Sequence, residues 1–253
     1  MFSKAIVRRP SKSLVNGLSS TNMGKPNYVQ ALKQHGAYVQ ALEECGLEIF
    51  YMEPEPLLPD STFVEDIALL TSECAVITNP GAPSRRGEIE GLRSVLDNHF
   101  DHIEQILAPG TLEAGDVMMV GTHFYIGLSE RTNRAGADQL ISQVNKYGLS
   151  GSIIELSEVL HLKTGVAYLE NNNLLASGEF LNHPDFKSFN TLPVSDSESY
   201  AANCIWVNEK VLMPQGYPET KKAIHTAGYE LIEVDVSEFR KLDGGLSCLS
   251  LRF

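Results

Sequence analysis

Three stretches of similar design determine the fold prediction: EDIALLT at 65–71, EAGDVMMV at 113–120 and HLKTGVAYL at 161–169. Each opens with a titratable residue and continues as an apolar strand, and a turn and a second strand follow. The second strands are expected at 74–78, 123–127 and 173–177. The leading residues Glu65, Glu113 and His161 are evenly spaced, 48 positions apart. This regular phase indicates an internal repeat.

The repeating unit is predicted to be strand, strand, helix, strand. A fourth hairpin fits less neatly at 202–207 and 211–213. Apolar residues at helical spacing predict helices, and short apolar runs after them predict third strands. The helices are expected at 28–45, 88–100, 133–147 and from Pro218 to about Gly228, and the strands at 48–51, 103–107, 152–156 and 229–234.

A repeat of about 45–50 residues is typical of propellers, in which no unit can bury its face alone. Five units account for 253 residues if the C-terminal strand, 247–253, pairs with an N-terminal strand at 4–8. The prediction is therefore a single domain, 1–253, with the fold of a five-bladed α/β propeller of ββαβ repeats. The blades would have pseudo-five-fold symmetry, and the N- and C-terminal strands would close the ring.

Composition excludes several classes of function. The net charge of −12 argues against nucleic-acid binding. Neither a signal peptide nor a membrane-spanning run is expected. The cysteines at 45, 74, 204 and 248 lack CxxC or metal-ligand spacing, which predicts neither a disulfide scaffold nor a metal site. GxGxxG, GxxxxGK[ST] and GxSxG motifs are absent. We expect a cytoplasmic protein.

Cys248 lies in DGGLSCLS, 243–250, where glycines and serines give its thiol little apolar cover. Taken alone, a cysteine is more often a small buried hydrophobe. His161 could likewise be a core histidine, and Glu65, Asp66 and Asp116 could be acids at strand starts and turns. Ring closure, however, would bring Cys248 to the same phase as Glu65, Glu113 and His161. The shared phase favours one site on the axis of the ring.

Converging cysteine, histidine and carboxylates are typical of a thiolate nucleophile, a general acid and base, and acids that bind or orient a substrate. Clustered negative charge favours a cationic electrophile. A guanidinium fits best, since two carboxylates can hold its planar array of N–H donors.

Motifs along essentially the whole chain carry a family resemblance: SLVNGL (13–18), FVED (63–66), GAPSRRGE (81–88), EAGD (113–116), YIG (125–127), RTN (131–133), HLKTG (161–165) and the Cys248 segment. With these residues the sequence resembles the guanidino-modifying enzymes of the α/β propeller class, the pentein superfamily. It closely resembles the bacterial dimethylarginine dimethylaminohydrolases.

The resemblance implies hydrolysis of Nω-methylated arginine to citrulline and an amine. Cys248 would attack the guanidinium carbon and form a covalent S-alkylthiouronium. His161 would protonate the leaving amine and then activate water. Glu113 would orient His161 and help hold the guanidinium. Asp66 would bind the unmethylated side of the guanidinium, with Glu65 also implied in substrate binding.

The resemblance also implies how the amino-acid end of the substrate is bound. Arg85 and Arg131 would meet its carboxylate, with Arg86 as a rival to Arg85. Asp60 and the backbone carbonyls of Leu18 and Leu242 would meet its ammonium. Residues 16–18 resemble the family's mobile lid. No cofactor is implied, the partner is the small-molecule substrate, and a homodimer is compatible with the sequence.

Lys163 separates this sequence from arginine deiminases, which resemble it but carry an acid two residues after the histidine. A lysine there removes one acceptor for the guanidinium, which suits a methylated nitrogen with fewer N–H groups. The alternatives are an arginine deiminase or an amidinotransferase of the same superfamily, and, more distantly, a propeller that only binds a partner.

Overall fold

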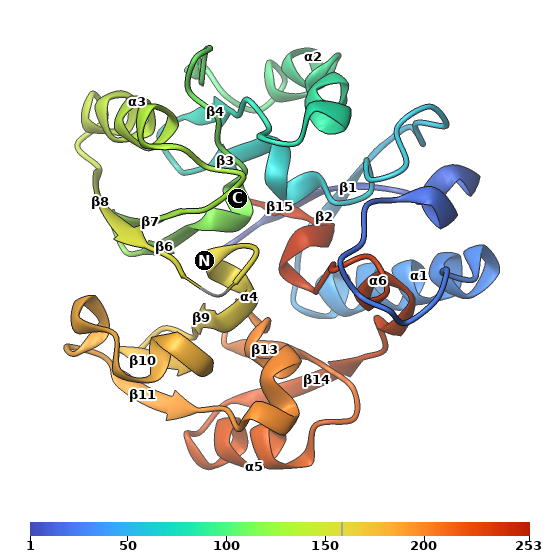
Figure 1. Ribbon diagram of the computed structural model, residues 1–253, viewed down its shortest axis with the longest axis vertical. Helices are drawn as coiled ribbons and strands as arrows, with labels where there is room; N and C mark the ends of the chain where they lie inside the picture. Colours follow the sequence, from blue (N-terminus) through green and yellow to red (C-terminus); the bar gives the residue numbers. More distant parts are fainter. Residues whose placement is uncertain (158) are drawn as a thin grey trace. The chain divides into compact units, whose positions relative to one another are not determined.

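Five three-stranded sheets are present in the computed structural model, which describes residues 1–157 and 159–253 (Figure 1). In each sheet the middle strand pairs antiparallel with one neighbour and parallel with the other. The strands are β3–β4–β5 (Ala68–Leu70, Ala75–Ile77, Ile103–Gln105), β6–β7–β8 (Val117–Val120, His123–Leu128, Ser150–Glu155), β9–β10–β11 (Val166–Tyr168, Asn173–Ala176, Asn190–Pro193), β12–β13–β14 (Ile205–Val207, Lys210–Pro214, Glu230–Val234) and β15–β1–β2 (Leu251–Arg252, Lys4–Arg8, Glu48–Met52). The predicted fold class, an α/β propeller of five ββαβ repeats, is confirmed.

Turn chemistry explains the hairpins. The β9–β10 turn places Glu170, Asn171 and Asn172 at positive φ, and the β12–β13 turn does the same with Asn208 and Glu209. Asparagine tolerates this left-handed conformation better than most residues, so short turns of this kind favour it.

Helical segments connect the second and third strand of each sheet, because a parallel pair needs a crossover. They are α1 (Tyr28–Glu44), η3 (Pro83–Ile89) with α2 (Leu92–Leu96), α3 (Arg134–Asn145), η5 (Gly178–Asn182) with η6 (Pro184–Phe186), and α5 (Pro218–Thr226). Asn27 and Asn133 cap α1 and α3 by accepting main-chain N–H groups. The helix predicted at 88–100 is wrong in extent, because Gly91 adopts a left-handed conformation (φ 73°) and separates η3 from α2.

A short helical segment precedes the first strand of every sheet: η2 (Val64–Ile67), η4 (Ala114–Asp116), α4 (Leu162–Gly165), η7 (Asp196–Ala202) and η8 (Ser247–Leu249). The expectation that the leading residues run directly into strands is therefore wrong. Cys248 lies in η8, and its strand begins only at Leu251, because the Cys248 and Leu249 N–H groups bond back to the carbonyls of Gly245 and Leu246. Each leading residue nevertheless lies in, or directly before, the short helical segment that precedes the first strand of its sheet.

The described residues form two compact units, 1–64 with 164–252 and 65–163 with 253. The first unit holds three sheets and also contains η1 (Lys12–Asn16) and α6 (Ser237–Arg240). In one of these three sheets, β1 pairs antiparallel with β15, and this confirms the predicted pairing of the terminal strands. The second unit holds two sheets, with a core that includes Val76, Phe124 and Leu140. The single domain over 1–253 stays a prediction.

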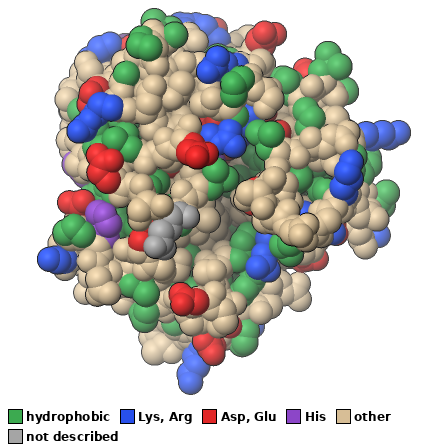
Figure 2. All heavy atoms as spheres, in the orientation of Figure 1, with side chains coloured by type: hydrophobic (Ala, Val, Ile, Leu, Met, Phe, Trp, Pro, Cys, Tyr) green, Lys and Arg blue, Asp and Glu red, His purple; other side chains and the backbone are tan. Residues whose placement is uncertain are grey.

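Charged side chains of both signs lie on the surface. On the face drawn in Figure 2, lysine and arginine side chains are interspersed with acidic ones. Among the described residues, no helix is both long and apolar enough to cross a membrane.

Candidate functional site

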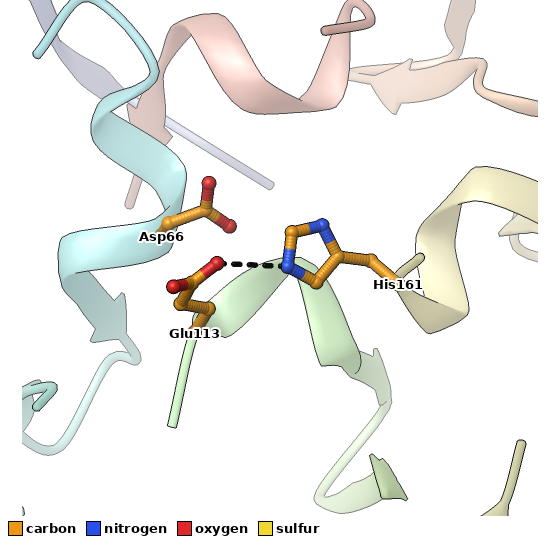
Figure 3. A group of neighbouring side chains, drawn as sticks. All are labelled: Asp66, Glu113 and His161. Carbon is orange, nitrogen blue, oxygen red and sulfur yellow. Dashed lines mark hydrogen bonds and ion pairs between the residues drawn. The ribbon is translucent and has the colours of Figure 1, made fainter. Parts of the chain in front are cut away.

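Three predicted site residues converge in the second unit (Figure 3). His161 Nε2 lies 2.9 Å from Glu113 Oε2, and one ligand atom of each of Asp66, Glu113 and His161 lies within 4.8 Å of the others. Asp66 belongs to η2, Glu113 is the N-cap residue of η4, and His161 immediately precedes α4. The short segments before the strands therefore bring these side chains together.

Gly115 allows this close approach. Its N–H donates to Asp66 Oδ1 at 3.0 Å. A Cβ at residue 115 would lie 2.7 Å from Asp66 Oδ1, closer than real Cβ atoms come, and 3.1 Å from the His161 ring, which is a tight contact. Any side chain here would push the carboxylate and the imidazole apart.

Arg85 is buried among these carboxylates. Its Nη1 lies 2.5 Å from Asp66 Oδ2 and 3.9 Å from Glu113 Oε2, while Nε and Nη2 bond the carboxylate of Glu88. Sequence reasoning missed Glu88 as a site residue, although its position three residues after Arg85 is a usable signal. The acids and His161 are close enough to share a metal ion, but a guanidinium already pairs with Asp66. The absence of a metal site stays a prediction.

Glu65 and Asp66 are adjacent in η2 but have different partners. Glu65 Oε1 lies 2.6 Å from Lys163 Nζ, and Glu65 is buried while Lys163 is partly covered. The lysine singled out in the sequence thus neutralises one of the two predicted guanidinium-binding acids.

The electrostatics of the cluster favour a protonated His161. Burial alone would lower its pKa, but the carboxylates of Asp66 and Asp116 and the hydrogen bond to Glu113 raise the pKa to about 9. Burial disfavours the charged form of Glu113, yet the bond to His161 and the charge of Arg85 hold the pKa of that carboxyl below its ordinary value. At neutral pH the pair is therefore an imidazolium and a carboxylate.

This pKa predicts how stability depends on pH. Because the pKa of His161 rises from 6.5 to about 9 on folding, its stabilising contribution is complete below about pH 6.5 and is lost as the pH rises through about 9. We expect the difference in unfolding free energy between the parent and His161→Gln to shrink from about pH 7 to about pH 10, measured by urea denaturation. A His123→Gln variant is the control, and a difference that grows with pH would contradict the assignment.

Arg131 lies in the same unit, in the turn after β7. It is half-buried, and its N–H donates to Ser129 Oγ. Its side chain forms no ion pair with any other residue in the described part of the chain. Arg131 therefore offers a charge to an external carboxylate more readily than Arg85 does.

The remaining predicted residues lie in the first unit. The Leu18 N–H donates to Asp60 Oδ1 at 2.9 Å. Leu18 is 41% exposed, whereas Leu242 is 7% exposed. Beyond Leu18, Ser20 donates its N–H and hydroxyl to the Asp243 carboxylate, and the Ser19 hydroxyl donates to the Lys241 carbonyl. The segment carrying Leu18 is thus tied both to Asp60 and to the segment carrying Leu242.

Cys248 is half-buried, whereas Cys45, Cys74 and Cys204 are buried. The Gly245 N–H points to Cys248 Sγ at 3.5 Å. Asn203 holds the preceding residue, Ser247, by bonding both its main-chain N–H and its hydroxyl. Since Cys248 and His161 belong to different units, their meeting at one site stays a prediction.

Comparison with known proteins finds a matching family model and relatives that match along the full length of the chain. The sequence model of the family described as "N,N dimethylarginine dimethylhydrolase, eukaryotic" matches residues 19–171. The chain is 57% identical to the N(G),N(G)-dimethylarginine dimethylaminohydrolase of Pseudomonas aeruginosa, covering 100% of both proteins, and 37% identical to that of Streptomyces coelicolor, covering 98% of this chain and 96% of the relative.

Solved structures match as well. One is the Pseudomonas aeruginosa enzyme as a cysteine-to-serine variant complexed with citrulline. Another is a dimethylarginine dimethylaminohydrolase histidine-to-glycine variant in an adduct with S-methyl-L-thiocitrulline. Each has a TM-score of 0.99 at 57% identity and covers 100% of both chains. The N-terminal domain of a cyanobacterial arginine dihydrolase has a TM-score of 0.89 at 18% identity and shares the fold.

Proposed function

Because this chain belongs to the dimethylarginine dimethylaminohydrolase family, we propose that it hydrolyses Nω-methylated arginine to citrulline and dimethylamine or methylamine. Full-length identity of 57% to the Pseudomonas aeruginosa enzyme supports this activity. The observation that carries it is the His161–Glu113 pair beside Asp66, which joins a proton donor to acids suited to a guanidinium.

In the first half of the reaction, the Cys248 sulfur bonds the guanidinium carbon and the bond from that carbon to the methylated nitrogen breaks. His161 gives its proton to the leaving amine, in keeping with its raised pKa. Since His161 already carries a proton, we infer that Cys248 loses its own proton to water when the cationic substrate binds. The product of this half is an S-alkylthiouronium on Cys248.

In the second half, neutral His161 takes a proton from water as the water oxygen bonds the amidine carbon. The carbon–sulfur bond then breaks, and the hydroxyl proton of the adduct passes to the departing sulfur, which releases citrulline and restores the Cys248 thiol. Glu113 keeps the ring oriented in both halves and stabilises its charged form. One substrate molecule and one water thus give citrulline and one amine.

Asp66 is the proposed acceptor for the unmethylated side of the guanidinium. The Arg85 guanidinium, which Asp66 binds in this structure, supports this role because it is the same planar cation as the substrate group. Substrate would then displace Arg85 from Asp66. Arg85, still paired with Glu88, would join Arg131 at the substrate carboxylate, and Asp60 with the carbonyls of Leu18 and Leu242 would bind the ammonium.

Lys163 supports the choice of a methylated substrate. Because its ammonium pairs with Glu65, the site has fewer carboxylate oxygens to offer a guanidinium with all its N–H groups. Arginine itself should therefore be bound less well than its methylated forms. Cytoplasmic location and a homodimer remain expectations.

A substrate panel tests the proposed function. Purified protein is incubated separately with asymmetric dimethylarginine, monomethylarginine and arginine, and citrulline is measured, with Cys248→Ala as the blank. We expect citrulline from both methylated substrates and at least about tenfold less from arginine, the discrimination that one missing hydrogen-bond acceptor supplies. Turnover of arginine alone would instead identify a deiminase.

A further inference from the structure

Asp116 is a buried acid that the reaction steps above do not use. It is the last residue of η4, three positions after Glu113, and it is 0% exposed. Its Oδ1 accepts the Leu162 N–H at 3.0 Å, and its Oδ2 accepts the Ser129 hydroxyl at 2.6 Å. A buried carboxylate is costly unless it is bonded in this way.

The partners of Asp116 lie next to the proposed catalytic and binding residues. Leu162 directly follows His161 and begins α4, so the bond to its N–H fixes the main chain that carries the imidazole. Ser129 Oγ in turn accepts the N–H groups of Arg131 at 3.0 Å and Thr132 at 3.2 Å.

The network then returns to Glu113. The Thr132 hydroxyl accepts the Glu113 N–H at 3.2 Å. Burial raises the pKa of the Asp116 carboxyl, and the charge of His161 and the hydroxyls of Ser129 and Thr132 oppose that rise. One carboxylate therefore connects the three chain segments that carry Glu113, Arg131 and His161, all within the second unit.

Asp116 also contributes charge. Three carboxylates, those of Asp66, Glu113 and Asp116, act on His161, and Arg85 lies beside two of them. A well-packed apolar residue would fill the space of Asp116 without the cost of burying a charge. The N–H of Leu162, the hydroxyl of Ser129 and the positive charge of His161 explain why a carboxylate occupies this position.

We propose that Asp116 is a positioning residue, which holds the main chain next to His161 and the Arg131 turn in register with Glu113 without touching the substrate. This inference rests on the role proposed for His161. It assigns Asp116 a function in the reaction beyond that of a structural hairpin acid.

Asp116→Asn tests the proposal, because it keeps the shape of the side chain but leaves only one acceptor oxygen. Ser129 Oγ already accepts two N–H groups, so it cannot also accept from the new amide. We expect kcat per folded protein to fall roughly 10–100-fold, the usual effect of losing a partner behind a reacting group. KM should rise by a smaller factor than kcat falls, because Asp116 holds the Arg131 turn only indirectly, through Ser129. The pKa of His161, followed by NMR of histidine-labelled protein, should fall toward 6.5.

Glu198→Gln is the matched control. Glu198 is also a buried carboxylate and accepts the N–H groups of Glu219 and Thr220 at the start of α5. It belongs to the other unit. We expect this variant to lose stability but to keep the kcat and the His161 titration of the parent.

The outcomes separate the two proposals. If Asp116→Asn keeps the parent kcat and His161 titration, Asp116 is only structural and the inference is wrong. Ser129→Ala, which removes one donor to Asp116, should show a smaller loss of kcat in the same direction and covers the case in which Asp116→Asn does not fold. The NMR titration needs no turnover, so it still tests Asp116 if the parent fails to hydrolyse methylated arginine.

Discussion

Cys248→Ser is expected to reduce kcat for methylated arginine on the order of 10⁴–10⁶-fold, the effect of replacing a catalytic nucleophile. A serine hydroxyl keeps the shape of the side chain but ionises far less readily than a thiol, so the first half of the reaction stops. Initial rates of citrulline formation measure the loss. Since serine keeps the shape of the side chain, we expect Cys248→Ser to bind citrulline about as tightly as the parent, measured by calorimetry.

Cys204→Ser is the matched control for this substitution. The Cys204 thiol is buried and donates to the Ala201 carbonyl, and a serine hydroxyl can make the same bond. Cys204→Ser should keep kcat within about threefold of the parent, since its thiol has no part in the reaction. If Cys248→Ser turns over dimethylarginine as fast as Cys204→Ser, Cys248 is not the nucleophile.

His161→Gly is expected to separate the two halves of the reaction. With dimethylarginine, kcat should fall roughly 10²–10⁴-fold, because the amine needs a proton to leave. With S-methyl-L-thiocitrulline, a thiolate can leave without that proton, so the adduct should form but then persist for want of a base.

Intact-protein mass spectrometry over time follows this adduct. His123→Gly is the control, because His123 lies in β7 and bonds Ser150 and Ser152 outside the carboxylate cluster. The control should turn the compound over without accumulating adduct. An adduct on His161→Gly that hydrolyses as fast as on the parent would assign the general base to another residue.

Much of the fold can be predicted from the sequence, because the hairpin turns are strong local signals and the 48-residue spacing shows that the units repeat. The terminal pairing of β1 with β15 follows from the need to complete a fifth unit. The short segments η2, η4 and η8 could not be predicted in the same way. They have only three or four residues and are held by turn bonds such as Asp116 N–H to the Glu113 carbonyl, which leave no hydrophobic period.

The repeat also made part of the site predictable. Glu113 and His161 meet because their positions share a phase in the repeat, and Asp66 directly follows Glu65, which shares that phase. The partners of the charged groups were not predictable. Only the spacing of Arg85 and Glu88 was a usable signal. The pairing of Arg85 with Asp66 and of Glu65 with Lys163 depends on which way side chains turn from short segments, and a single sequence carries no signal of that choice.

The central claim is that Cys248 forms a covalent bond to the amidine carbon of methylated arginine, with the proton supplied by His161. Acid quenching during turnover, followed by mass spectrometry of the Cys248 peptide, tests it most directly. The account predicts one and the same adduct from dimethylarginine and monomethylarginine, because each substrate loses its methylated amine and leaves an identical thiouronium. Adducts that retain the methyl groups, or an adduct on any residue other than Cys248, would contradict it.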